Sequence, residues 1–441
     1  MESLYMPRRH LPDYLFVILA AALLLMTVLW QIPMMVWNHL NLVPILEAWR
    51  EGTLSHSAIF RFDGGHIHTA AYAVLLVTAN LSHGHPWVVD VVSWVLLLAS
   101  AAIVRPFIYA TVQTDTRGGT AMAAMLVFLA LYPGHLANLQ WGWQVAVFLC
   151  LLGVSVVIWS LTRPQLSWWH SVLALMGAAL AYCSFATALA AFPVALLLIA
   201  LRHDQSRRRR LLAAIPWLLA GLGILLIYRR FATPSMGRGA PAEFVYLLNF
   251  LGAGISRLAT GIAPWIGLCG IALAVWASWR CRGDRTSLPW IGFAVFGFLA
   301  GALVALGRDS ALGADQAFVS RYVSFSILFW LGLFGLLCNI HLSTPSRRMR
   351  VVMVVIAIFA CANALQLMHR ASRVSARTYA IAQAIRETWP KVNNQLLAEI
   401  YFDQPQTAYQ RLQVLRAWGY APFREALPAV IDNPSGARSG H

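Results

Sequence analysis

The sequence carries little charge and very few acids: 11% of its 441 residues are charged, and only 17 are Asp or Glu. It contains one lysine, Lys391, so the net charge of +16 comes from arginine. The arginines cluster in short loops between apolar runs, as topology signals and lipid-headgroup contacts do, rather than as a nucleic-acid groove would. This composition excludes a soluble globular domain and argues against a nucleic-acid partner.

Paired cysteines are also missing. The chain has six cysteines, five of them inside apolar runs, and no two of them have Cys-x-x-Cys spacing. Neither a disulfide framework nor a thiolate metal site is therefore indicated. The sequence also shows no internal repeat.

Apolar sequence is what the chain has in abundance, with 59% hydrophobic residues and a mean hydropathy of +0.64. Apolar runs of about 17–25 residues recur, each long enough to cross a ~30 Å hydrocarbon core. We predict an all-α polytopic membrane protein with about eleven to thirteen spanning or re-entrant helices. The first run, 14–35, lacks a small-residue cleavage site, so we expect it to be a spanning helix.

The topology follows from the arginine-rich loops. The loops 202–210, 280–285 and 346–350 are each separated by two apolar segments, so all three can lie on the cytoplasmic side. Extending this pattern backwards places the N-terminus and the Arg117 loop on the cytoplasmic side too. Two segments on the same side must be separated by an even number of crossings, but three apolar stretches lie between these two. We therefore predict that 66–82 is short, tilted or re-entrant on the outer side. The alternative is that it crosses and that the Arg117 loop lies outside.

The chain divides into a membrane body and a tail. We expect residues 1–368 to form the body, and residues 369–441 to form a small amphipathic helical domain on the outer side. Its apolar residues recur at helical spacing, and its last residues are expected to be disordered.

The strongest candidate for chemistry is the run from Phe62 to His68, which follows the first spanning segment and its loop. It places Asp63 beside two glycines, with His66 and His68 close behind. An acid and two histidines at the edge of an apolar slab are costly unless they are solvated or used. We predict Asp63 as a catalytic base, with His66 beside it and His68 binding substrate. A divalent metal held by the three side chains is an alternative.

A second acid is the runner-up for the base. Few acids are available on the predicted outer face before the tail: Glu47, Glu51, Asp63, Glu243, Asp309 and Asp315, with Asp90 near a helix end. Glu47 lies in a stretch, 41–50, whose apolar residues have the spacing of an amphipathic surface helix. Glu47 is therefore the second candidate, unless it only pairs with Arg50 or solvates that helix.

Further candidates could bind a sugar or a phosphate. Trp141, Trp143 and Gln144 open an apolar segment, where the indoles could anchor the membrane interface or stack on a sugar. Outer arginines at membrane depth need an anionic partner, which is a phosphate or an acid such as Asp309. The predicted phosphate-binding set is Arg257, Arg308 and Arg321, with Tyr322 beside the last.

The segment 244–251 is predicted to be an interfacial helix. Phe244, Leu247, Leu248 and Leu251 would form one stripe, which we expect to face a lipid tail at the entrance to the site. The alternative is that the segment simply continues the next spanning helix.

These motifs, taken in order, resemble a family. They are one spanning helix, an outer amphipathic loop, an acid-His turn, Trp141-Gly-Trp-Gln144, a Ser184-Phe-Ala186-x-x-Leu189 hairpin, Ser320-Arg-Tyr322 and an amphipathic tail. The order is similar to that of bacterial polytopic glycosyltransferases of GT-C architecture. Two departures are visible: the chain reads Asn38-His-Leu-Asn-Leu-Val43 where the family has an acidic pair, and Asp63 to His68 replaces an Asn-Glu-His-Arg-like turn.

The resemblance implies a GT-C-like fold in a bacterial inner membrane. It also implies transfer of a sugar from a polyprenyl-phosphate donor to a lipid-linked or surface glycan, or to a protein, at a site facing the periplasm. Membrane lipids would be further partners, and a divalent metal is left open. Three alternatives remain: a transporter or flippase for a lipid-linked saccharide, a glycan polymerase or ligase, and an inactive GT-C-like scaffold.

Overall fold

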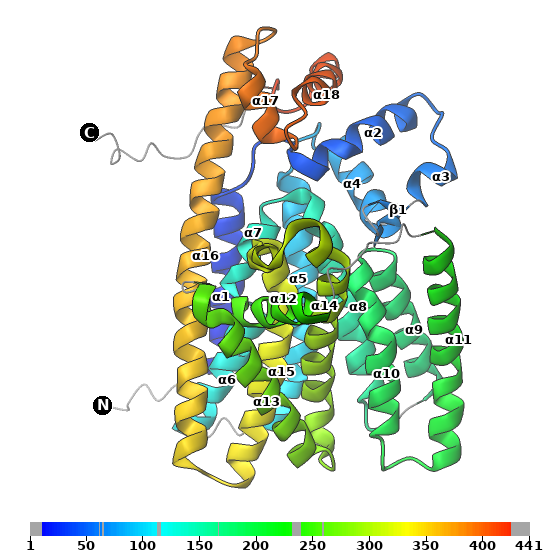
Figure 1. Ribbon diagram of the computed structural model, residues 1–441, viewed down its shortest axis with the longest axis vertical. Coiled ribbons are helices and arrows are strands. Elements are labelled where there is room, and N and C mark those ends of the chain that lie inside the picture. Colours follow the sequence, from blue (N-terminus) through cyan, green and yellow to red (C-terminus); the bar gives the residue numbers. More distant parts are fainter. Residues whose placement is uncertain are drawn as a thin grey trace, which may run out of the picture.

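The computed structural model describes residues 11–60, 62–63, 66–112, 116–165, 167–231, 240–257 and 260–424, whose regular structure is almost entirely helical (Figure 1). The first part contains α1 (Leu11–Leu29), the 3₁₀ helix η2 (Trp37–Leu42), α2 (Val43–Arg50), α3 (His56–Ile59), β1 (Phe62–Asp63), β2 (His66–Ile67), α4 (Thr69–Leu81), α5 (Trp87–Thr111), α6 (Arg117–Ala130), η3 (Pro133–His135), α7 (Leu136–Leu139), η4 (Gly142–Gln144) and α8 (Val145–Leu161). The second part contains α9 (Trp168–Tyr182), η5 (Ala186–Ala190), α10 (Ala191–Ala200), α11 (Arg207–Phe231), α12 (Ala240–Ala253), η6 (Thr260–Ile262), α13 (Ala263–Cys281), η7 (Arg285–Ser287), α14 (Leu288–Leu312), η8 (Ala314–Phe318), η9 (Ser320–Tyr322), α15 (Val323–Ser343), α16 (Arg347–Thr388), α17 (Asn394–Ile400) and α18 (Pro405–Ala417).

Nine helices in this described part are long and apolar enough to cross a membrane. Two shorter apolar segments, Thr69–Leu81 and Ala186–Ala200, accompany them. Their length and hydropathy meet the requirement for spanning a hydrocarbon core. The prediction of an all-α, multi-pass membrane protein is therefore confirmed.

The bundle is built around α15 and α8. The apolar window of α15 is 94% buried and that of α8 is 83% buried, whereas only 6% of the window of α11 is buried. Helix α11 packs on α10, where Trp217 and Phe192 lie 5.9 Å apart between ring centroids. The rest of this leucine-rich helix faces outward, and such a long apolar surface requires a cover, which a bilayer would provide.

The arginine-rich loops gather at one end of the bundle, here called the arginine end. Arg285 donates to the carbonyl of Arg163 at 2.8 Å and lies 3.6 Å from the Asp204 carboxylate, so the loops after α8, α10 and α13 meet. Trp290, near the start of α14, donates to Thr111 at the end of α5 at 2.8 Å. Figure 1 shows the turn from α15 to α16 at this end too. The prediction that these loops share one side is confirmed.

Helix α4 stays at the opposite end, here called the outer end. The backbone N–H of Ala70, at its start, donates to the carbonyl of Cys183 at the end of α9 at 2.9 Å. At its other end, the carbonyl of His83 accepts the N–H of Ala421 from the C-terminal segment at 3.2 Å. Both ends of this 13-residue helix contact outer elements. This agrees with the prediction that 66–82 makes no independent full crossing.

The C-terminal helices cover the outer end. Helix α16 runs unbroken for 42 residues, so the predicted boundary at residue 368 falls inside it. Beyond it, α17 and α18 lie beside η2 and α2 (Figure 1). Trp37 donates to the carbonyl of Glu399 at 3.1 Å, and Tyr401 and Arg411 both donate to the side chain of Asn41. The division into body and tail stays a prediction, and residues 425–441 lie outside the described part.

Helix α12 differs from its prediction. It is a separate helix that lies crosswise to the bundle in Figure 1, so it does not continue α13. Leu247, Leu248 and Leu251 are buried against protein, and only Phe244, half exposed, remains on the surface. The expectation that this stripe faces a lipid tail is wrong for the three leucines, because α13, α14 and α15 cover them.

Candidate functional site

The predicted acid-His turn is a short hairpin at the outer end. Strands β1 and β2 pair antiparallel, with Phe62 opposite Ile67 and Asp63 opposite His66. This register brings the backbones of Asp63 and His66 side by side, although the side chains of both residues lie outside the described part. Their predicted roles as catalytic residues stay predictions.

His68 and Trp143 belong to one buried aromatic cluster. The imidazole of His68 lies 5.3 Å from the Trp143 ring, and both rings lie edge-on to Tyr72. Nδ1 of His68 is 3.0 Å from the carbonyl oxygen of Ser184, which fixes the ring between α4 and the end of α9. Because Trp143 is only 5% exposed, it serves as core here rather than as an open surface for stacking on a sugar.

The Trp-Gly-Trp-Gln segment packs tightly against two other elements. A Cβ atom on Gly142 would lie 2.5 Å from the Val89 side chain and 2.7 Å from the ring of His39, so only glycine fits there. The half-buried Trp141 meets Trp37 edge-on at 5.1 Å. Helix α5, η2 and η4 therefore meet at this glycine.

Several buried polar atoms near this junction have no hydrogen-bond partner in the described part of the chain. They include Nε1 of Trp141, Oε1 of Gln144 and both carboxylate oxygens of Asp90. Buried polar groups are normally paired, so each unpaired atom calls for a water, an ion or a ligand. Asp90 and His39 are the residues that the sequence did not single out. The sequence feature that could have identified Asp90 is its position as an acid in the first turn of an apolar helix.

Arg321 and Tyr322 lie at the start of α15. Asn138 of α7 donates to the carbonyl of Arg321 at 3.0 Å and to the hydroxyl of Ser324 at 2.7 Å. The Arg321 guanidinium lies 5.1 Å from the ring of Tyr322 and makes no ion pair with a described carboxylate. The exposed Asp315 is therefore not its partner. Asp309 is the acid predicted as an alternative partner, and its side chain lies outside the described part. Among the described residues, the Arg321 cation has no acidic partner.

Arg257 is buried in the loop between α12 and α13. Its backbone N–H donates to Oδ1 of Asn363 at 3.0 Å, and its side chain is 8% exposed. Nη1 is buried without a hydrogen-bond partner. Burial, and then the nearby charge of Arg370, lower the pKa of Arg257 to about 10. Gly254 of the same loop lies against Ser326, one turn beyond Tyr322, so the loop that carries Arg257 packs on the first turns of α15.

Of the remaining predicted residues, Glu47 is not brought into this arrangement and Arg308 stays a prediction. Glu47 is half-buried on α2, which packs mainly on η2 and α18. It forms no ion pair with Arg50, whose guanidinium stacks instead on Trp418 at 4.7 Å and on Tyr420 at 5.1 Å. Arg308 lies in α14, and its side chain is outside the described part.

The metal alternative also remains open. No three His, Cys, Asp or Glu side chains come together among the residues that were searched, which are the described ones. The predicted set of Asp63, His66 and His68 includes two side chains outside that part, so the search does not test it.

Comparisons with known proteins give little beyond the geometry. No family model matches the chain, and no curated protein matches it. One solved structure is similar, that of ArnT from Cupriavidus metallidurans in the apo state. The match has 13% sequence identity, covers 92% of this chain and 76% of that chain, and has a TM-score of 0.44. At that score the likeness carries no argument about function.

Proposed function

We propose that this multi-pass membrane protein is a glycosyltransferase. It moves a sugar from a polyprenyl-phosphate donor to a lipid-linked or surface glycan, or to a protein, at the outer end of the bundle. The outer end would face the periplasm of a bacterial inner membrane, since arginine-rich loops remain on the cytoplasmic side. The order of motifs that resembles GT-C glycosyltransferases supports this proposal.

One observation supports the proposal: Arg257 is buried beside a second arginine, Arg370, and no described carboxylate forms an ion pair with it. A buried cation without a partner is expensive, and the cost rises when a like charge is close. A phosphate would supply both the charge and the acceptors that Nη1 of Arg257 lacks. Arg321 at the start of α15, also without a described acidic partner, is proposed to add a second contact.

The proposed reaction assigns a role to each candidate residue. The acceptor hydroxyl attacks the anomeric carbon, the bond from that carbon to the phosphate oxygen breaks, and its electron pair leaves with the polyprenyl phosphate. Asp63, with Glu47 as the runner-up, takes the hydroxyl proton. Arg257 and Arg321 stabilise the negative charge that develops on the departing phosphate. The unpaired Trp141 Nε1 and Gln144 Oε1 are a donor and an acceptor suited to sugar hydroxyls.

The proposal is tested with the purified chain in proteoliposomes and a panel of labelled polyprenyl-phosphate sugars. The expected products are free polyprenyl phosphate and a labelled acceptor. Arg257→Gln should lower kcat by about 100-fold, the usual loss when one charge-stabilising group is removed. Arg373→Gln, an exposed arginine on α16, is the matched control and should leave the rate unchanged.

Two of the following three outcomes would contradict the proposal, and the other would change only the identity of the base. Movement of intact donor across the membrane without release of polyprenyl phosphate would identify a transporter. Full activity of Asp63→Asn, with Glu47→Gln inactive, would move the base to Glu47 and leave the transfer reaction intact. Full activity of both variants would remove the assigned base altogether.

A further inference from the structure

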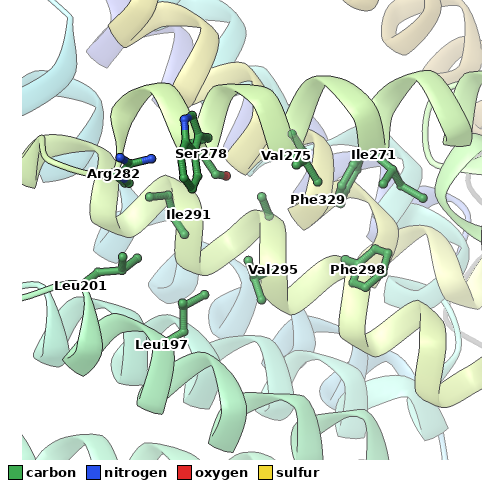
Figure 2. Close-up of a pocket in the computed structure, with 13 residues that line it drawn as sticks. Leu197, Leu201, Ile271, Val275, Ser278, Arg282, Ile291, Val295, Phe298 and Phe329 are labelled. Carbon is green, nitrogen blue, oxygen red and sulfur yellow. The ribbon is translucent and has the colours of Figure 1, made fainter.

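A cavity of about 450 Å³ lies between α10, α13 and α14, on the half of the bundle toward the arginine end. Figure 2 shows it running from Arg282 and Leu201 at one side to Phe298 and Ile271 at the other. Its walls are apolar along this length, with Leu197, Val275 and Val295 between the two ends. This region is remote from the outer end, so it is distinct from the proposed transfer site.

The cavity is open to the surroundings of the bundle. Val275 is 65% exposed and Trp279 is 70% exposed, although both line it. They belong to α13, which is long and apolar enough to span a membrane. Side chains in this position face the bilayer, so lipid chains have direct lateral access to the cavity.

One side of the cavity is cationic. The guanidinium of Arg282 stacks on the Trp279 ring at 3.6 Å from its centroid and makes no ion pair with a described carboxylate. Two acids of the loops at this end, Asp284 and Asp204, already have partners. Asp284 accepts from Thr286 and Ser287. Asp204 accepts two hydrogen bonds from Arg202 and lies 3.6 Å from Arg285.

The cavity therefore matches the two parts of an anionic lipid. A cation and an interfacial indole lie at one side, where a headgroup would bind, and an apolar channel leads away from them. Interfacial tryptophan and arginine sit at headgroup level in a bilayer, and polybasic ends of membrane proteins attract anionic lipids. We propose that this cavity binds an anionic glycerophospholipid from the leaflet at the arginine end. Its phosphate contacts Arg282, and one acyl chain lies between α10, α13 and α14.

The test uses the full chain and phosphatidylglycerol, with phosphatidylcholine of the same chains as the zwitterionic comparison. Native mass spectrometry of the detergent-purified protein counts retained lipids. Wild type should retain phosphatidylglycerol in preference to phosphatidylcholine, and Arg282→Gln should reduce that preference about fivefold, the effect of one arginine near an anionic surface. Arg208→Gln, an exposed arginine at the same end, is the matched control and should keep the wild-type preference.

A second measurement has a wild-type part that does not depend on any variant folding. Phosphatidylglycerol with a photoreactive group in its acyl chain should label peptides of α13 and α14 in the wild-type chain, and Val295→Phe, which fills the cavity, should lower this labelling severalfold. Equal lipid preference in Arg282→Gln and Arg208→Gln would overturn the proposal. So would labelling elsewhere on the chain, or displacement of the photoreactive lipid by an equimolar amount of polyprenyl phosphate. These outcomes do not depend on sugar transfer, so they leave the proposed function untouched.

Discussion

The side chain of Asn363, in the middle of α16, holds the backbone N–H of Arg257 at 3.0 Å. The same amide donates to the carbonyl of Gly254 at 2.9 Å and to the hydroxyl of Tyr132 at 3.0 Å. Asn363 is fully buried, so these bonds form away from water. One amide therefore joins α16, the turn after α6 and the loop that carries the buried arginine.

Replacing Asn363 with Leu should destabilise the protein and weaken the proposed phosphate site. The change keeps the side-chain volume close but leaves the Arg257 N–H and the Gly254 carbonyl unpaired, at about 1–3 kcal/mol for each buried group. Thermal unfolding in detergent should show a clearly lower Tm. Cys361→Ala, an exposed position on the same helix, should stay within about 0.5 kcal/mol of wild type. An unchanged Tm for Asn363→Leu would mean that water or other groups replace these bonds.

The contact between α12 and α13 depends on glycine. A Cβ atom on Gly252 would lie 1.9 Å from the carbonyl oxygen of Ala263, and one on Gly267 would lie 2.2 Å from that of Leu248. Gly252→Ala should therefore push the helices apart and cost about 1–3 kcal/mol, as overpacking does.

The matched control for this prediction is Gly223→Ala in α11, where nothing lies within 4 Å of an added Cβ. It should be neutral or stabilise the helix by up to about 1 kcal/mol, because alanine has the higher helix propensity. Comparing the two Tm shifts separates close packing from propensity. Equal Tm shifts for the two variants would show that α12 and α13 accommodate the added methyl group without loss of stability, which would contradict the prediction.

Arg202 should be the most sensitive cation at the arginine end. Its guanidinium is 1% exposed and donates to three backbone carbonyls and to both oxygens of one carboxylate (Leu161, Arg163, Pro164 and Asp204). Arg202→Met strands those acceptors and should cost about 3 kcal/mol or more. Asp204→Asn should cost about 1 kcal/mol or less, since that carboxylate is partly exposed. Denaturant titration gives both values, and a larger loss for Asp204→Asn would contradict this ranking.

Hydropathy and charge were enough to predict the membrane class and the shared side of the arginine loops. These properties are local: a run of apolar residues must cross the bilayer, and its flanking arginines remain on one side. The parity of the arginine-rich loops favoured a segment 66–82 that makes no independent crossing, with a full crossing as the alternative. The contacts of Ala70 with Cys183 and of His83 with Ala421 agree with that prediction.

The contents of the outer end could not be predicted in the same way, because they depend on contacts between distant segments. Nothing in the sequence near Trp143 shows that His68 and Tyr72 enclose its ring. The bond between Asn363 and Arg257 joins positions 106 residues apart. The stripe in α12 had the correct helical period, but period does not tell whether lipid or protein covers a face, and three of its four residues face protein.

A last prediction concerns pH and the buried His39, which lies against Gly142. Burial lowers the pKa of His39 from 6.5 to about 3, so the folded state keeps the ring neutral where the unfolded chain protonates it. Between pH 6.5 and about pH 3, the unfolded chain therefore binds one more proton at His39 than the folded protein does. Stability is therefore complete above pH 6.5 and falls as the pH drops below it, by up to ~1.4 kcal/mol per pH unit.

The Tm of the wild-type protein should accordingly be lower at pH 5 than at pH 8. His39→Phe keeps a ring beside Gly142 without the titrating nitrogen, so its Tm should fall less over the same interval. Some dependence should remain, since burial also lowers the pKa of His85 to about 4. His56→Gln, an exposed histidine, should follow wild type. If the Tm of His39→Phe decreases as much as that of wild type between pH 8 and pH 5, a group other than His39 causes the loss of stability.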